Sequence, residues 1–201
     1  ETPGEAISLY TAFNEQDEAN YVARQVESWA DQGHRREDCA ILYRSNAQSR
    51  QFEEKLIALG IPYRVYGGVR FFERQEIKDA LAYLRLVHNP EDDASFERIF
   101  NTPPRGIGDK TLERVREIAR TGEVSMWKAS LTLIEDTQTP RRTRSALEAF
   151  KSLILGLGTQ IEGARFSASL ETVLAHSGLT EHYKKERGDL AEQRVENLQE
   201  L

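Results

Sequence analysis

The pattern of the chain changes at Asn89-Pro90, and this break constrains the fold more than any other feature. Before it, three short apolar segments alternate with stretches of helical periodicity. The segments cover residues 6–13, 39–43 and 63–66, and the second has the continuous apolar character of a strand buried on both faces. A β-α-β-α-β-α order implies a parallel sheet covered by helices. We therefore predict a small α/β part with three strands.

Capping residues support helices between these strands. Asn14 has a side chain typical of a helix N-cap and precedes apolar residues at helical spacing. Ser45 and Gln48 stand three residues apart and have the pattern of a capping box, with a helix expected to run to Leu59. A third helix is predicted from Arg74, because apolar residues then recur on one stripe.

Beyond Asn89-Pro90 the chain has helical periodicity and no convincing strand pattern. Helices are expected at about residues 92–100, 109–121, 125–135, 141–157, 167–177, 179–185 and 190–201. The last stretch reaches the end of the chain without a cap, which indicates a truncated chain. The predicted fold class is therefore α/β followed by all-α: a partial parallel sheet of three strands with helices, and then a helical domain.

The composition excludes several classes of protein. The chain has 201 residues, enough for one or two domains, and its 39% hydrophobic and 30% charged residues are typical of a soluble, folded protein. No apolar stretch approaches the roughly 20 residues that a membrane helix needs, and the N-terminus has no signal-peptide pattern. The single cysteine, Cys39, cannot form an internal disulfide, which agrees with the reducing cytoplasm that we expect.

The residue patterns of hydrolytic and metal sites are absent. The sequence contains no Gly-x-x-x-x-Gly-Lys-Ser/Thr loop, which would hold the phosphates of a nucleotide. The four histidines are scattered and have no ligand spacing, and Cys39 is expected in the core rather than as a nucleophile. We therefore predict no catalytic residue, no metal ligand and no cofactor bound by this chain.

The net charge of −6 argues mildly against DNA as a partner, because a protein that grips phosphates needs a positive surface. Net charge averages over all faces, however, so a local basic patch has to be judged by position. Two segments offer such a position.

The first segment, residues 43–50, lies where the apolar run ends and a helix begins. Ligands bind at this carboxyl edge in open parallel sheets. Arg44, Asn46 and the free amides of the helix suit phosphate or base edges. The competing interpretation is an ordinary strand-to-helix turn, with Ser45 as the cap and solvated arginines.

The second segment, residues 101–111, contains Gly106-Ile107-Gly108 between two predicted helices. The glycines permit a tight hairpin and close backbone approach, and Arg105 and Lys110 add positive charge beside it. Helix-hairpin-helix motifs that hold DNA backbone are built in this way, and the alternative is a plain helix-helix corner. We expect Ile107 to face inward and Asp109 to act as the N-cap of the next helix.

A third basic stretch, Arg141-Arg142-Thr143-Arg144, opens a predicted helix. We interpret it as a solvated helix start rather than as a binding site.

Three long motifs together resemble the UvrD/PcrA/Rep type of superfamily-one DNA helicases, and the UvrD members above all. They are Ala-Ile-Leu-Tyr-Arg-Ser-Asn-Ala-Gln-Ser-Arg at 40–50, Pro-Tyr-Arg-Val-Tyr-Gly-Gly-Val-Arg-Phe-Phe-Glu-Arg-Gln-Glu-Ile-Lys-Asp at 62–79, and Asn-Thr-Pro-Pro-Arg-Gly-Ile-Gly at 101–108. The resemblance covers essentially the whole chain, in the right order and spacing. It implies an internal fragment, with residues 1–89 part of the RecA-like motor domain 2A and residues 90–201 much of the helical domain 2B.

The resemblance also implies a function. Such helicases use ATP and Mg²⁺ to move 3′ to 5′ on single-stranded DNA in repair and replication, but the ATP-binding motifs of the family fall outside this chain, so the fragment alone is expected to be inactive. Arg44 and Asn46 match positions that touch single-stranded DNA. The hairpin matches the part that lies against duplex DNA, which gives the expected duplex contacts as Arg105, Gly106, Ile107, Gly108, Lys110 and Thr111.

Two alternatives belong to other classes of function. The helical domain is a mobile regulatory element in this family, so its helices after Pro140 are alternatively a module that binds mismatch-repair and excision-repair proteins. A free-standing domain like a response regulator is the other alternative, and it fails because the first segment lacks the acidic cluster that would bind a metal.

Overall fold

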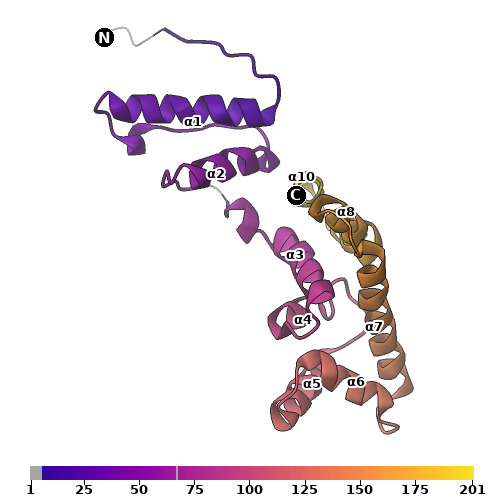
Figure 1. Cartoon of the computed structure of the whole chain (residues 1–201). Helices are drawn as coiled ribbons and strands as arrows, with labels where there is room; N and C mark the ends of the chain where they lie inside the picture. The colour runs from indigo at the N-terminus through magenta and orange to yellow at the C-terminus, as the bar shows by residue number, and fades with distance from the viewer. Residues whose placement is uncertain (1–5, 67) are drawn as a thin grey trace. The chain divides into compact units, whose positions relative to one another are not determined.

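The computed structural model describes residues 6–66 and 68–201 and is helical (Figure 1). The described residues form ten α-helices and three short 3-10 helices. The contacts divide the chain into two units: the first ends at Phe71 and the second begins at Phe72. No helix in the described part of the chain is both long and apolar enough to cross a membrane.

The first unit is built on two helices, α1 (Glu15–Asp31) and α2 (Ser49–Ala58), which pack against each other. The Asn14 side chain accepts a hydrogen bond from Asp17 N at 2.8 Å, so the predicted N-cap of α1 is confirmed. Two 3-10 turns, η1 (Arg36–Asp38) and η2 (Asn46–Gln48), connect these helices, and η3 (Phe71–Glu73) follows them. The buried apolar residues of the unit are Ala19, Ala23, Phe52, Leu56, Ile61 and Phe71.

The predicted three-stranded parallel sheet is wrong for this structure. None of the segments 6–13, 39–43 and 63–66 forms a strand in the part of the chain that is described. A strand depends on ladder hydrogen bonds from a neighbouring strand, and the backbone hydrogen bonds of the described residues include none between these segments. Leu42, expected inside a strand buried on both faces, is 93% exposed. Cys39, expected in the core, is only half-buried.

The second unit contains the remaining eight helices, in close agreement with the predicted ranges. They are α3 (Gln75–His88), α4 (Asp93–Ile99), α5 (Asp109–Gly122), α6 (Met126–Glu135), α7 (Arg141–Ile161), α8 (Phe166–Ser177), α9 (Leu179–Lys184) and α10 (Asp189–Glu200). α3 contacts α4, α7, α8 and α9, and α7 also packs on α6 and α8. α3 and α7 are therefore the central elements of the unit.

An aromatic cluster fills the space between α4, α6 and α7. The rings of Phe96 and Phe100 lie 4.8 Å apart, and each meets the Phe150 ring edge-on at 5.7 Å. Trp127 of α6 joins them, with its ring 6.5 Å from that of Phe150. Edge-to-face pairs of this kind contribute about 0.5–1.5 kcal/mol each beyond the burial of their surface. This cluster fixes the position of α4, from which the Gly-Ile-Gly segment leaves.

A buried polar network joins the start of α3 to α10. Arg74 Nη1 donates a hydrogen bond to Asn197 Oδ1 at 2.7 Å, and Asn197 Nδ2 donates to Glu76 Oε1 at 2.6 Å. All three residues are buried. Buried polar groups are expensive unless they are hydrogen-bonded, so this network specifies how α3 and α10 pair.

A second buried carboxylate, Asp79, ties α3 to α4 and α9. Arg98 Nε lies 2.6 Å from Asp79 Oδ1, and the Tyr183 hydroxyl donates a hydrogen bond to Oδ2. Burial, and then this hydrogen bond to a carboxylate, raise the pKa of the Tyr183 phenol. The Arg194 guanidinium covers the Tyr183 ring at 5.0 Å, which links α10 to the same cluster.

Candidate nucleic-acid interface

The first candidate segment is a turn that its own side chains fix in shape. The Gln48 Oε1 atom accepts hydrogen bonds from Arg44 N at 3.1 Å and Ser45 N at 3.0 Å, while Ser45 Oγ accepts from Ala47 N at 3.3 Å. The predicted capping box is therefore present. It holds the backbone on both sides of Arg44 in one conformation and delivers the chain into α2.

Arg44 and Asn46, the predicted contacts to single-stranded DNA, have different surroundings. Arg44 is exposed, and its guanidinium makes no ion pair with any described residue. Asn46 is half-buried and lines a pocket of about 1020 Å³ in the first unit. The turn therefore brings a solvated cation and an amide to neighbouring positions, which is a combination suited to phosphate and base edges.

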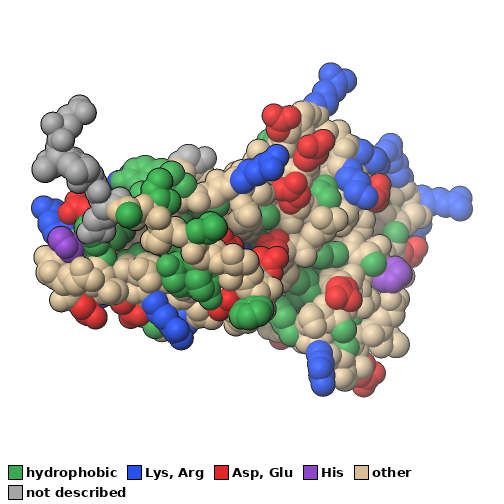
Figure 2. Space-filling view, turned by 90° about the horizontal axis from the view of Figure 1, so that it is seen from above, with side chains coloured by type: hydrophobic (Ala, Val, Ile, Leu, Met, Phe, Trp, Pro, Cys, Tyr) green, Lys and Arg blue, Asp and Glu red, His purple; other side chains and the backbone are tan. Residues whose placement is uncertain are grey.

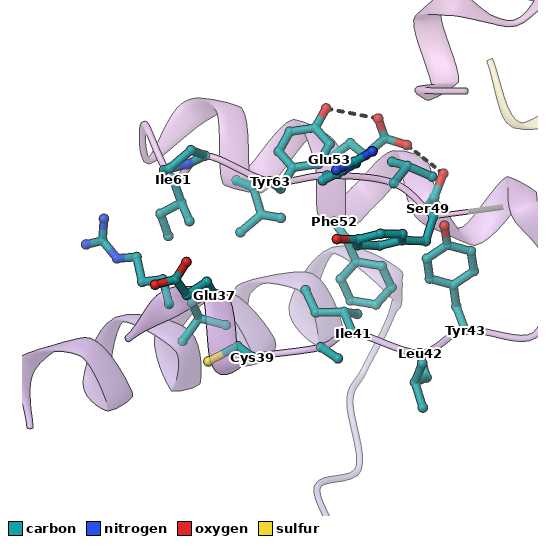
Figure 3. A pocket seen from close by; sticks show the side chains of 18 of the residues that line it. Glu37, Cys39, Ile41, Leu42, Tyr43, Ser49, Phe52, Glu53, Ile61 and Tyr63 are labelled. Carbon is teal, nitrogen blue, oxygen red and sulfur yellow. Dashed lines mark hydrogen bonds between the residues drawn. The ribbon is translucent and has the colours of Figure 1, made fainter. Parts of the chain in front are cut away.

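The pocket beside this turn is mainly apolar. Figure 3 shows Ile41, Tyr43, Phe52 and Ile61 around it, while Leu42 points away. Its lining residues come from α1, η1, η2, α2 and the segments at 39–43 and 61–66. Among the described residues no group of histidines, cysteines or carboxylates has the arrangement of a metal site. The pocket is therefore a mainly apolar space with polar side chains such as Glu53 in its wall.

Glu53, which the sequence did not single out, anchors one wall of this pocket. Its buried carboxylate accepts hydrogen bonds from Ser49 Oγ at 2.7 Å, Tyr63 OH at 2.9 Å and Phe71 N at 3.2 Å (Figure 3 draws the first two). These donors come from α2, from residue 63 and from the end of the unit. Glu53 is therefore a residue that holds the unit together, because the three donors compensate the burial of its charge.

The second candidate segment, which we call the Gly-Ile-Gly hairpin (residues 105–108), connects α4 to α5. Asn101 Oδ1 accepts a hydrogen bond from Arg105 N at 2.7 Å and starts the turn. Gly106 has φ +73°, which is a conformation that favours glycine, and both glycines are exposed. Ile107 is 2% exposed, so its predicted inward orientation is confirmed.

The start of α5 differs in detail from the prediction. The N-cap is Gly108, with φ −84° and ψ 169°, and Asp109 is the first residue of the helix. The expectation that Asp109 caps α5 is therefore wrong. A glycine cap has no side-chain acceptor, so the first amides of the helix have no capping side chain. Lys110 and Thr111 lie in this first turn, where Lys110 is exposed and Thr111 half-buried.

Arg105 points into the protein. Its Nη1 atom donates hydrogen bonds to the carbonyl oxygens of Ile99 and Pro103, both at 3.0 Å, and Nη2 donates to the Tyr83 hydroxyl. The guanidinium carbon also lies 5.6 Å from the Tyr83 ring centre and 5.4 Å from that of Phe150. The predicted duplex contact thus occupies a site in which its cation is already satisfied.

The environment of Tyr83 reflects this burial. Burial raises the pKa of the Tyr83 phenol to about 12, although the neighbouring Arg105 guanidinium acts in the opposite direction. The Tyr83 hydroxyl in turn donates a hydrogen bond to Thr102 O at 2.7 Å. Tyr83 and Arg105 therefore fasten the hairpin to α3, and the apolar α3 pattern seen in the sequence contained no signal for this role.

Comparison with known proteins gives the family of the chain. Residues 1–201 match the UvrD-like helicase C-terminal domain. The chain is 50% identical over 198 residues to DNA helicase II of Haemophilus influenzae and of Escherichia coli, and 38% identical over 199 residues to the ATP-dependent DNA helicase PcrA of Bacillus subtilis. These alignments cover 98% of the chain but only 27–28% of the relatives, so the chain spans little more than a quarter of their length. The chain therefore belongs to the UvrD-like helicase C-terminal domain family.

Proposed function

We propose that this chain is the DNA-contacting part of an ATP-dependent helicase that moves 3′ to 5′ on single-stranded DNA in repair and replication. The observation that carries the proposal is the match of the whole chain to helicase relatives, together with two exposed backbone turns that present cations. In this proposal ATP and Mg²⁺ are bound by parts of the longer protein that lie outside residues 1–201. The chain alone then has no ATPase activity, in agreement with the absence of a phosphate-binding loop from its sequence.

Single-stranded DNA is assigned to the turn at Arg44 and Asn46. The capping box fixes the backbone there, so binding through the exposed Arg44 requires no further ordering of that backbone. A phosphate contact by Arg44 and a polar contact by Asn46 make this a backbone-reading site with limited base preference.

Duplex DNA is assigned to the Gly-Ile-Gly hairpin. Gly106 and Gly108 are exposed and have no side chains, which allows the backbone to approach phosphates closely. Lys110 and Thr111 of α5 add a charge and a hydroxyl, and Ile107 anchors the turn in the core. Such a contact would read the backbone without regard to base sequence.

The distribution of charge limits the strength of these contacts. Basic and acidic side chains are interspersed over much of the face shown in Figure 2, and the net charge is −6. A broad electrostatic attraction to DNA is therefore weak, and binding has to come from a few local cations. Because only a few phosphates are then neutralised, affinity should fall with added salt along a modest slope.

The proposal is tested by titrating the chain against fluorescently labelled single-stranded, duplex and forked DNA at several salt concentrations. We expect binding to all three, with the logarithm of affinity falling linearly with the logarithm of salt concentration. If the chain binds none of the three DNAs in a salt-dependent way, the proposal is contradicted.

A second function is favoured by one observation in the helical unit. Leu155 of α7 is 51% exposed and Phe166 of α8 is 65% exposed, and large exposed apolar side chains are typical of protein-binding surfaces. The alternative is a regulatory module that binds mismatch-repair or excision-repair proteins. In that case the titration shows no DNA binding by the chain.

A further inference from the structure

The inference concerns which arginine serves the Gly-Ile-Gly hairpin, and it rests on the duplex contact proposed above. The sequence favours Arg105, but its guanidinium is held by the carbonyl oxygens of Ile99 and Pro103 and by Tyr83. To reach a phosphate, Arg105 would have to give up these partners and leave the rings that cover it. The structure therefore leaves the exposed side of the hairpin without the cation expected there.

Another arginine, from a distant part of the sequence, lies beside the hairpin. A Cβ atom added to Gly106 would lie 3.7 Å from Arg142 Nη2. Arg142 belongs to the first turn of α7 and is exposed. The Arg142 guanidinium therefore lies close to the exposed backbone at Gly106.

Arg142 has no partner among the described residues, in contrast to Arg114 and Arg116 of the same unit. Arg114 of α5 forms an ion pair with Asp136 at 2.9 Å, and Arg116 pairs with Glu97. No ion pair or hydrogen bond of the described residues involves Arg142. Asp109, the exposed carboxylate closest in sequence to the glycines, would repel a phosphate. Neither Arg142 nor Lys110 forms an ion pair with a described residue, so both cations remain uncompensated.

The position of Arg142 on its helix is also unfavourable in the absence of an anion. α7 has 21 residues, begins with Arg141 and Arg142, and has no acidic residue in its first turn. The N-terminal end of a helix carries partial positive charge, so cations there are repelled and anions attracted. A bound phosphate would offset this repulsion.

From these observations we propose that Arg142, with Lys110, holds a backbone phosphate of duplex DNA at the Gly-Ile-Gly hairpin, and that Arg105 is a positioning residue. The planar guanidinium of Arg142 offers two parallel donors to phosphate oxygens. Arg105 holds the hairpin from within through the end of α4 and through Tyr83 of α3. The phosphate site is thus assembled from α5 and α7, which are separate in the sequence.

The test compares salt titrations of duplex binding by fluorescence anisotropy for the wild-type chain and single variants. Arg142→Ala should lower duplex affinity about tenfold at low salt and reduce the slope of log affinity against log salt by about 0.9. Arg142→Gln, which keeps the length and polarity of the side chain, should behave in the same way. The matched control is Arg120→Ala, which removes an exposed charge from the last turn of α5 and should change neither quantity.

Arg105→Ala distinguishes positioning from direct contact. It should lower the melting temperature and weaken binding by the same factor at every salt concentration, because it removes placement rather than a phosphate contact. Two results would overturn the inference and leave the proposed function standing. One is a salt slope reduced by about 0.9 in Arg105→Ala, and the other is an Arg142→Ala variant that binds duplex DNA like the Arg120→Ala control. A wild-type chain that does not bind duplex DNA would instead refute the proposed duplex contact, and this inference with it.

Discussion

At the scale of single residues, the structure separates arginines that look alike in sequence. Arg44 and Arg105 both stand in short polar turns between apolar stretches. Arg44 remains exposed because its turn is closed by Gln48, whereas Arg105 is drawn under two aromatic rings that offer a partly desolvated site. The difference depends on the rings of Tyr83 and Phe150, which are remote in the chain.

The first prediction concerns Arg44. Arg44→Ala should weaken binding of single-stranded DNA by about 1.5–3 kcal/mol, the value of a charge-assisted hydrogen bond, and leave the melting temperature unchanged. Anisotropy titrations and thermal unfolding followed by circular dichroism measure the two quantities. Arg24→Ala, which removes another exposed charge in the same unit, is the control. Equal affinities for the two variants would make the turn a structural element only.

The second prediction concerns pH and Asp92, the N-cap of α4. Hydrogen bonds from Ser95 N at 3.0 Å and Ser95 Oγ at 2.7 Å hold the pKa of this carboxyl below its ordinary value of 3.8. A lowered folded-state pKa means that the stabilisation is present above pH 3.8 and is lost as pH falls through the folded value. Asp92→Asn should therefore unfold at lower urea concentration than the wild type at pH 7, and the difference should shrink towards pH 3. A difference that is independent of pH would show that the charge of Asp92 contributes nothing.

At the scale of elements, the buried polar network determines how α3 meets α10. Asn197 hydrogen-bonds both Arg74 and Glu76 in this network, and all three are buried. Removing the Asn197 side chain takes one buried acceptor from Arg74 and one buried donor from Glu76. The loss of a buried partner costs more than the hydrogen bond itself contributes.

The third prediction follows from this network. Asn197→Ala should lower the free energy of unfolding by about 1–3 kcal/mol. Gln199→Ala, an exposed position of the same helix, should change it by less than about 0.5 kcal/mol. Urea unfolding monitored by circular dichroism compares the two, and comparable losses would mean that α10 is only loosely attached through this network.

The comparison of sequence and structure shows which elements could be predicted. Helix ranges agree within a few residues, because helices such as α5 and α7 depend on local periodicity and backbone bonds within the element. The strands were predicted wrongly, because residues 39–43 have strand composition but a ladder requires a partner strand. The positions of Tyr83 and Arg142 beside the hairpin were not predictable, since both depend on contacts between distant parts of the chain.

At the scale of the whole molecule, the two units differ in how completely their apolar residues are covered. In the helical unit, every helix from α3 to α9 buries apolar side chains. Leu155 and Phe166 are among the large apolar residues of this unit that stay exposed. In the first unit, Ile7 is 100% exposed, Leu9 94% and Leu42 93%. The division of the chain at residue 89 into motor and helical domains stays a prediction.

The fourth prediction is that the chain self-associates through the apolar segments of its first unit. Exposed apolar residues on unpaired backbone are templates for pairing with another chain. Leu42→Lys should reduce the concentration-dependent growth in sedimentation coefficient, whereas Ile57→Lys, at an exposed position of helix α2, should have little effect. A monomeric wild-type chain at high protein concentration would contradict this expectation.

The two glycines of the hairpin should differ sharply in mutational tolerance. Gly106 has φ +73°, a backbone conformation in which L side chains are strained. Gly108 has φ −84° and nothing within 4 Å of an added Cβ, so alanine fits. In a saturation library selected for folded protein, position 106 should retain glycine with occasional asparagine, while position 108 should accept alanine and serine. Equal substitution profiles at the two positions would show that the hairpin adopts another backbone conformation.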